Sequence, residues 1–133
     1  DGLGIRLLAE QGIETALITA RNSKIVSKRA ENLGIRRVYQ GSLNKLEAFH
    51  DLLSGTGLAP DQVCYAGDDW LDLPILERAG LSVTVSDGDP VVKKRVHWVT
   101  NRSGGRGAVR EVCDLILAAQ GLDGKALDGI LQQ

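Results

Sequence analysis

The chain has 133 residues, a length that suits one ordinary domain and argues against two independent hydrophobic cores. It carries 16 Lys and Arg against 17 Asp and Glu, and 43% of its residues are hydrophobic, which excludes a disordered tail and a generally basic nucleic-acid binder. No apolar run approaches the roughly 18 residues that span a bilayer, so we expect a soluble protein without a membrane partner.

Cysteine and methionine usage gives two further expectations. Cys64 and Cys113 both lie in apolar stretches, which indicates buried thiols in a reducing, cytoplasmic compartment rather than a disulfide scaffold. The chain has no Met and opens with Asp1, so we expect it to be part of a longer translation product. Whether a targeting segment precedes Asp1 is left open by the sequence.

Helices and strands alternate through the first half of the sequence. Ser23 is a typical helix N-cap, and Gly12 and Gly34 are typical of helix C-termini. Apolar residues at helical spacing and short β-leaning runs fill the intervals between them. We expect, in order, a helix over 3–10, a strand over 15–19, a helix over 23–33, a strand over 37–40 and a helix over 45–53.

The second half continues the alternation with shorter elements. Pro74 and Pro90 occupy typical first-turn helical positions, and the tail after Gln120 contains glycines and is expected to fray. We expect strands over 62–66, 81–85 and 97–100 and helices over 72–79, 90–95 and 109–119. The chain then divides into a core domain over 1–121 and a C-terminal tail over 122–133.

This alternation predicts an α/β fold of Rossmann-like type, three layers deep, with a mainly parallel sheet covered by helices on both faces. In such sheets, ligands bind at the carboxyl ends of the strands. Three of the predicted ends are polar: Thr19 and Arg21 follow one strand, Lys45 opens the helix after another, and GDDWLD at 67–72 follows a third. Together they indicate a site for a phosphate and a divalent cation.

The GDDWLD motif supplies the acidic part of this site. Adjacent carboxylates at a strand end repel one another unless a cation or proton compensates them, and oxygen-only ligands suit Mg²⁺. We expect Asp68, Asp69 and Asp72 to serve a Mg²⁺ cofactor. The Thr19 hydroxyl and the Lys45 ammonium would share the phosphoryl oxygens and stabilise charge in the transition state.

Each of these residues also has a plain structural interpretation. Asp69 or Asp72 can cap the following helix, Thr19 can simply end a strand, and Lys45 and Arg21 can be solvated surface residues. Only their coincidence at the strand ends favours a site.

The remaining polar features are weaker. The glycine-rich run at 104–107 is typical of a flexible joint as well as of an anion cradle at a helix start. His50 and His97 lack a metal-ligand partner at a suitable spacing and are expected to be structural. Trp70 and Trp98 are too isolated to stack nucleic-acid bases.

Four ordered motifs carry a resemblance to a known family. They are LITAR at 17–21, GSLNK at 41–45, YAGDDWLDLP at 65–74 and GGRGAVREVCDLIL at 104–117. They resemble the haloacid dehalogenase (HAD) phosphatases, and more narrowly the small, capless branch of the 3-deoxy-D-manno-octulosonate 8-phosphate phosphatases. The resemblance runs from Asp1 to about Gly121.

The resemblance implies roles for residues at the strand ends. Thr19 would hydrogen-bond the phosphoryl group, and Lys45 would orient the phosphate and the nucleophile. Asp68 would be a direct Mg²⁺ ligand, with Asp69 or Asp72 supporting it.

The resemblance also implies a substrate and an assembly. The substrate would be a phosphorylated eight-carbon acid sugar (Kdo) of lipopolysaccharide biosynthesis, which Arg21 would contact. The segment with Arg106 resembles the tail that a neighbouring subunit lays over the site in the family's homo-tetramers.

One family motif is absent from the 133 residues: DxDG after an apolar strand, which supplies the attacking aspartate and the acid–base aspartate. Asp1 does not match it, because no apolar strand precedes that residue. Ala20 also replaces a usual glycine, and Asn44 a frequent acid. The first central strand and the flap after it would then be missing between strands 15–19 and 62–66, leaving edges that are prone to association.

Three classes of function remain open. The first is a Mg²⁺-dependent phosphatase that forms an aspartyl-phosphate on a nucleophile upstream of this chain, so that the chain alone is inactive. The alternative is a non-catalytic oligomerisation module, as in the C-terminal region of some acid-sugar cytidylyltransferases, although retention of Lys45, Asp68 and Asp69 argues against it. A phospho-receiver domain uses similar residues in a different order and ranks third.

Overall fold

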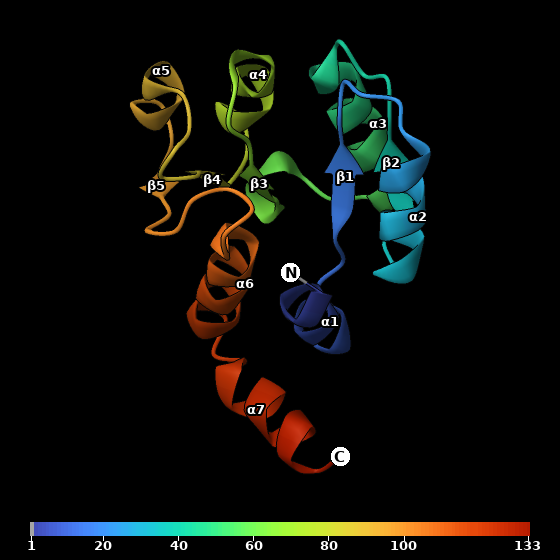
Figure 1. Cartoon of the computed structure of the whole chain (residues 1–133), viewed down its shortest axis with the longest axis vertical. Helices are drawn as coiled ribbons and strands as arrows, with labels where there is room; N and C mark the ends of the chain where they lie inside the picture. Colours follow the sequence, from blue (N-terminus) through green and yellow to red (C-terminus); the bar gives the residue numbers. More distant parts are fainter. Residues whose placement is uncertain (1) are drawn as a thin grey trace.

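The computed structural model describes residues 2–133, and Asp1 lies outside the described residues. The described chain alternates helices with short strands (Figure 1). The strands are β1 (Ala16–Ile18), β2 (Arg37–Tyr39), β3 (Cys64–Ala66), β4 (Leu81–Thr84) and β5 (Trp98–Val99). The α-helices are α1 (Gly2–Glu10), α2 (Lys24–Asn32), α3 (Lys45–Thr56), α4 (Leu73–Leu76), α5 (Pro90–Lys93), α6 (Ala108–Ala119) and α7 (Asp123–Leu131). The 3₁₀ turns are η1 (Pro60–Gln62) and η2 (Trp70–Asp72).

These elements confirm the predicted α/β alternation and most of its caps. The Ser23 hydroxyl accepts a hydrogen bond from the backbone N–H of Val26, as an N-cap does. Gly12 follows α1 with φ +80°, a left-handed conformation that favours glycine. The helix expected over 72–79 is shorter, because α4 covers only Leu73–Leu76 and the residues before it form the 3₁₀ turn η2, which Asp69 caps.

The expectation that the tail frays is wrong, because residues after Gln120 form α7. Leu122, Ala126 and Ile130 recur every four residues and pack against the buried core, with Ala126 only 4% exposed. This apolar stripe outweighs the poor helix propensity of the glycines in the same segment.

The strands form two parallel sheets rather than one continuous sheet. β1 pairs with β2, and β3, β4 and β5 pair in that order. Among the described residues, β1 and β3 therefore each keep one edge without a strand partner, and Figure 1 shows the two sheets standing apart. All residues of β1 are partly exposed, whereas Ser82, Val83 and Thr84 of the central strand β4 are buried.

Helix packing joins the two sheets. α1, which precedes the first sheet, packs on α6, which follows the second, and α3 packs on α4 in the same way. A Cβ at Gly4 would lie 3.0 Å from the Sγ of Cys113, so α1 and α6 approach closely there. The buried cluster at this junction consists of Ile5, Leu7, Leu8, Ala30, Ile35, Cys113, Leu117 and Ala126.

The two cysteines are free, as predicted, but only Cys113 is buried, whereas Cys64, also predicted to be a core residue, is partly exposed. Burial, with a smaller effect of the Cys113 thiol, raises the pKa of Cys64 to about 11. Among residues 2–133, none of the helices combines the length and the apolar character that a bilayer span requires.

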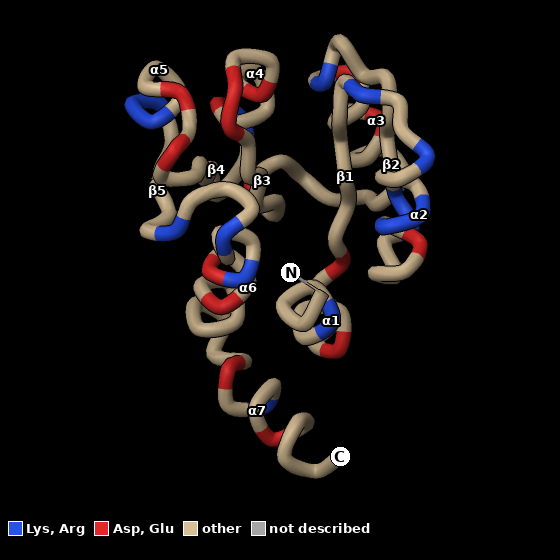
Figure 2. The backbone as a smooth tube through the Cα atoms, in the orientation of Figure 1, with Lys and Arg blue, Asp and Glu red and all other residues tan. Residues whose placement is uncertain are grey.

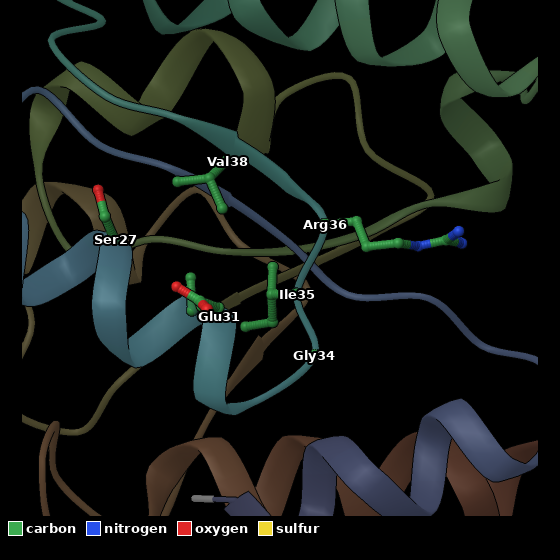
Figure 3. A pocket seen from close by; sticks show the side chains of 7 residues that line it. Ser27, Glu31, Gly34, Ile35, Arg36 and Val38 are labelled. Atoms are coloured by element: carbon green, nitrogen blue, oxygen red, sulfur yellow. The ribbon is translucent and has the colours of Figure 1, made fainter.

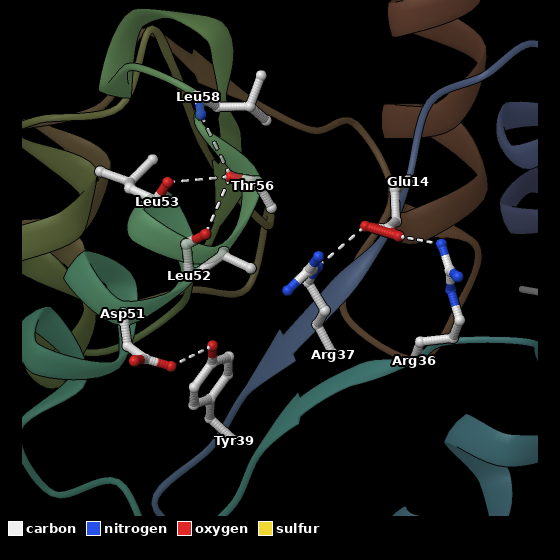
Figure 4. Close-up of polar contacts among 9 residues, drawn as sticks. All are labelled: Glu14, Arg36, Arg37, Tyr39, Asp51, Leu52, Leu53, Thr56 and Leu58. Carbon is white, nitrogen blue, oxygen red and sulfur yellow. Dashed lines mark hydrogen bonds and ion pairs between the residues drawn. The ribbon is translucent and has the colours of Figure 1, made fainter.

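Surface ion pairs tie the amino ends of β1 and β2 together. Glu14, just before β1, accepts Arg36 at 2.8 Å and Arg37 at 3.2 Å (Figure 4). These guanidinium groups hold the pKa of Glu14 below its usual range. The pairs are exposed, so they contribute little to stability.

Candidate active site

The residues predicted for the site lie on turns that follow the carboxyl ends of the strands. Figure 2 shows acidic segments leading into α4 and α5, and a basic segment at the turn after β1. The hydrogen bonds divide these residues into two groups. We call Lys45, Tyr65, Asp68, Asp69 and Asp72 the carboxylate–lysine cluster, and residues 19–21 the threonine–arginine turn.

Asp72 is the centre of the carboxylate–lysine cluster. Its Oδ1 accepts Lys45 Nζ at 2.7 Å and the Tyr65 hydroxyl at 2.6 Å. Its Oδ2 accepts the backbone N–H groups of Asp68 at 3.1 Å and of Asp69 at 3.2 Å. Asp72 is 2% exposed and the side chain of Lys45 12%. Two donors on each oxygen use the roughly four acceptor positions of a carboxylate, so this side chain holds the lysine and the loop.

Gly67 makes this arrangement possible. A Cβ at Gly67 would lie 2.5 Å from both Cβ and Cγ of Asp72, which no real side chain tolerates. The glycine that opens the GDDWLD motif is therefore required by the close approach of Asp72.

The other two aspartates differ in how many of their carboxylate oxygens accept hydrogen bonds within the described chain. Oδ1 of Asp69 accepts the backbone N–H of Leu71 at 2.8 Å and caps η2, which is the structural role considered for it above. Asp68 is exposed, and within residues 2–133 its carboxylate accepts no hydrogen bond. The oxygens of Asp68 and the second oxygen of Asp69 suit Mg²⁺, whereas those of Asp72 are taken. No three His, Cys, Asp or Glu side chains of the described chain form a metal-binding group.

The threonine–arginine turn is fastened to the segment that leads into α3. The backbone carbonyl of Thr19 accepts the N–H of Ser42 at 3.0 Å, and that of Arg21 accepts the N–H of Gly41 at 2.9 Å. The Thr19 hydroxyl accepts the N–H of Arg21 at 3.2 Å. The structure thus places Thr19 beside the turn that carries Lys45, while the guanidinium of Arg21 is exposed and unpaired among residues 2–133.

Arg106 lies on a segment that reaches the acidic loop only indirectly. The N–H of Gly104 donates to Asp87 Oδ1 at 2.8 Å, and the N–H of Asp89 donates to the carbonyl of Asp68 at 3.3 Å. The Arg106 side chain is exposed and makes no ion pair within the described chain. Within the described chain, Arg106 therefore has no hydrogen bond or ion pair from its side chain to the other predicted site residues.

Two residues that support the site were not singled out from the sequence. Tyr65 lies in the YAGDDWLDLP motif at 65–74, but nothing in its spacing indicates that its hydroxyl binds Asp72. Glu111 accepts the backbone N–H groups of Asn101 and Arg102 at 2.9 Å each, and so fixes the loop that leads into α6. A carboxylate in the first turn of a helix after a polar loop was the available signal for Glu111.

A surface hollow of about 390 Å³ lies away from these residues (Figure 3). It is lined by Ala30, Ile35 and Val38 and by polar residues of α2 and the turn before β2. None of the predicted site residues lines it. The candidate active site is therefore defined by its hydrogen-bond network rather than by a cavity.

Residues 35–112 match the family of haloacid dehalogenase-like hydrolases. The chain is 53% identical over 121 residues to the 3-deoxy-D-manno-octulosonate 8-phosphate phosphatase KdsC of Escherichia coli K12, a match that covers 91% of this chain. The chain spans only 64% of the length of that curated relative.

Solved structures show the same fold. A 3-deoxy-D-manno-octulosonate 8-phosphate phosphatase from Moraxella catarrhalis, in complex with a magnesium ion, a phosphate ion and KDO, is 38% identical with a TM-score of 0.91, over 96% of this chain and 74% of that one. A probable YrbI family phosphatase from Pseudomonas syringae pv. phaseolica is 42% identical with a TM-score of 0.95, over 98% of this chain and 74% of that one.

Proposed function

The chain belongs to the haloacid dehalogenase-like hydrolase family, in its 3-deoxy-D-manno-octulosonate 8-phosphate phosphatase branch, and from that premise we propose that it forms the phosphate-binding part of a Mg²⁺-dependent phosphatase for that sugar-acid phosphate. The observation that carries the proposal is the buried contact between Lys45 and Asp72. This contact holds the ammonium of Lys45, which opens the helix after β2, against the acidic loop that follows β3.

Lys45 and Thr19 supply the phosphate contacts in this proposal. The ammonium of Lys45 has three N–H donors, and within the described chain Asp72 accepts one of them. The other donors remain for phosphoryl oxygens. The Thr19 hydroxyl accepts a backbone N–H, so its own hydrogen is free to donate to the same phosphate.

Asp68 would hold the Mg²⁺ ion, with Asp69 supporting it. When bound, the ion neutralises phosphate charge and helps to orient the ester. Asp72, expected from the sequence to join the metal ligands, is instead assigned the role of anchor for Lys45, because its oxygens already accept four hydrogen bonds. The Moraxella catarrhalis structure, which contains a magnesium ion and a phosphate ion, supports a site for both ions in a protein of this fold.

The attacking aspartate is proposed to come from a strand outside these residues. Such a strand would lie between β1 and β3, where each has an edge without a strand partner among residues 2–133. Its carboxylate would form a bond to phosphorus as the bond to the sugar oxygen breaks, and that oxygen would take a proton from the acid–base aspartate of the same upstream motif. Water would then hydrolyse the acyl phosphate, releasing inorganic phosphate. On this account the 133 residues alone bind phosphate without turnover.

Substrate selection and assembly complete the proposal. Arg21 would contact the acid sugar, and Arg106 would reach the site of a neighbouring subunit of a homo-tetramer, since within the described chain its exposed side chain makes no ion pair. The enzyme would act in the cytoplasm, in the synthesis of a lipopolysaccharide precursor.

The test is phosphate release from 3-deoxy-D-manno-octulosonate 8-phosphate with Mg²⁺, measured on the protein that includes the upstream strand. Lys45→Ala is expected to lower kcat by about 10²-fold or more, as loss of a charge-stabilising donor does. Lys24→Ala, which removes an exposed lysine of α2, is the matched control and should leave kcat unchanged. A protein that assembles normally but releases no phosphate would instead be the non-catalytic module.

A further inference from the structure

The chain contains two tyrosines, and each donates its hydroxyl to an aspartate. Tyr39 of β2 donates to Asp51 of α3 at 2.7 Å, in an exposed position (Figure 4). Tyr65 donates to Asp72 at 2.6 Å, inside the carboxylate–lysine cluster. The chemistry of the two bonds is the same, but only the second one touches the candidate active site.

Tyr65 and Lys45 share one oxygen atom of Asp72. The hydroxyl lies 2.6 Å and the ammonium 2.7 Å from Oδ1, while Oδ2 is held by backbone N–H groups. Removal of the hydroxyl would leave Oδ1 to the ammonium alone. The negative charge of Oδ1 would then draw the ammonium further toward the carboxylate, and the carboxylate would lose one of its four restraints against rotation.

We propose that Tyr65 is a positioning residue, which acts through Asp72 to hold the Lys45 ammonium where it can donate to a phosphate. The inference rests on the proposed function for its ligand, and it assigns the geometry of Lys45 to a side chain outside the expected site residues. Tyr65 does not contact the phosphate in this account.

The Tyr65 phenol keeps its proton near neutral pH. Burial, reinforced by the hydrogen bond to Asp72, raises the pKa of Tyr65 far above its usual value. Tyr65 is therefore a permanent donor, and its effect on Lys45 does not depend on the pH of an assay near neutrality.

The experiment compares Tyr65→Phe with the matched control Tyr39→Phe. Each variant loses one phenol–carboxylate hydrogen bond, and inorganic phosphate is titrated calorimetrically in the presence of Mg²⁺. Tyr65→Phe is expected to weaken phosphate binding about 10-fold or more, the usual effect of removing a residue that orients a ligand-binding group. Tyr39→Phe is expected to leave phosphate binding unchanged. Equal binding by Tyr65→Phe and the unsubstituted protein would overturn the proposal.

A second readout separates positioning from a general loss of structure. The ¹³Cε and ¹⁵Nζ NMR signals of Lys45 report on its ammonium without any phosphate, and they are expected to shift in Tyr65→Phe but not in Tyr39→Phe. Unmoved Lys45 signals would overturn the proposal even if Tyr65→Phe bound phosphate weakly. If the unsubstituted protein binds no phosphate, the proposed function fails, while the NMR signals still decide whether Tyr65 positions Lys45.

A double variant tests whether Tyr65 acts on phosphate binding through Lys45. If Tyr65 acts through Lys45, adding Tyr65→Phe to Lys45→Ala should cause no further loss of phosphate affinity. An additional 10-fold loss in the Lys45→Ala background would show that Tyr65 acts by another route, and would contradict the assignment.

Discussion

The two halves of the candidate site differ in how much of their geometry the chain fixes by itself. In the carboxylate–lysine cluster, the buried Asp72 accepts four hydrogen bonds and Lys45 is nearly enclosed. In the threonine–arginine turn, backbone bonds hold the turn, but the Arg21 guanidinium is exposed and unpaired within the described chain. The side-chain geometry of the carboxylate–lysine cluster is thus fixed before any ligand binds, whereas the Arg21 side chain of the threonine–arginine turn is not fixed by the described chain.

The two halves of the site therefore differ in how strongly they are coupled to the stability of the fold. A buried ammonium and carboxylate persist only when their charges and hydrogen bonds are matched, so the cluster couples the fold to the site. An exposed arginine costs the fold little and is free to select a substrate. Changes in the cluster should therefore affect stability and binding together, and changes in the turn should affect binding alone.

Asp72→Ala should have the largest effect on stability. It leaves the Lys45 ammonium and the Tyr65 hydroxyl buried without their acceptor, which is expected to lower the free energy of unfolding by about 3–5 kcal/mol. Urea denaturation measures this loss. Asp51→Ala removes the exposed acceptor of Tyr39 and should cost no more than about 1 kcal/mol. Similar losses of unfolding free energy in the two variants would show that the carboxylate–lysine cluster is not the half whose geometry is fixed by the fold.

Gly67→Ala comes next, because its methyl group would lie 2.5 Å from Asp72 atoms. We expect a loss of about 1–3 kcal/mol in the free energy of unfolding, together with weaker phosphate binding. Gly124→Ala is the control, since a Cβ there meets nothing within 4 Å in helix α7, and it should stabilise the protein by up to about 1 kcal/mol. A neutral Gly67→Ala would contradict the close approach of Asp72.

The pH dependence of stability offers a third test, on the strand that carries Tyr65. The pKa of Cys64 is about 11 in the folded chain against 9.0 for a free thiol, so the unfolded chain loses this proton first as the pH rises. The stabilisation is complete below pH 9 and is lost through pH 11, and it amounts to at most about 3 kcal/mol for this group. Cys64→Ala should flatten the fall of the unfolding free energy over this range, and an unchanged slope would contradict the partial burial of the thiol.

The smallest effect on stability is expected for Arg21→Ala. Its guanidinium has no partner in residues 2–133, so the free energy of unfolding should change by less than about 0.5 kcal/mol. The KM for 3-deoxy-D-manno-octulosonate 8-phosphate should nevertheless rise, while hydrolysis of a small aryl phosphate changes little. A loss of stability comparable to that of Asp72→Ala would remove the distinction between the two halves.

The sequence predicted the elements and the strand-end positions of Thr19, Lys45 and Asp68, because helical spacing, caps and polar strand ends are local features. It did not predict that Asp72 is saturated by other donors, because that follows from a contact between α3 and the acidic loop, far apart in the chain. It also missed α7, whose apolar stripe is visible in the sequence but is interrupted by glycines that favour a loop.

The central claim is that Thr19, Lys45 and Asp68 surround one phosphate and its magnesium ion. The most direct measurement is a crystal structure of the protein with its proposed upstream strand, grown with Mg²⁺ and inorganic phosphate. We expect phosphate oxygens within hydrogen-bond distance of both Lys45 Nζ and Thr19 Oγ1, and the metal on the Asp68 carboxylate. A phosphate bound elsewhere, or a metal held by Asp72 in place of Lys45, would contradict the account.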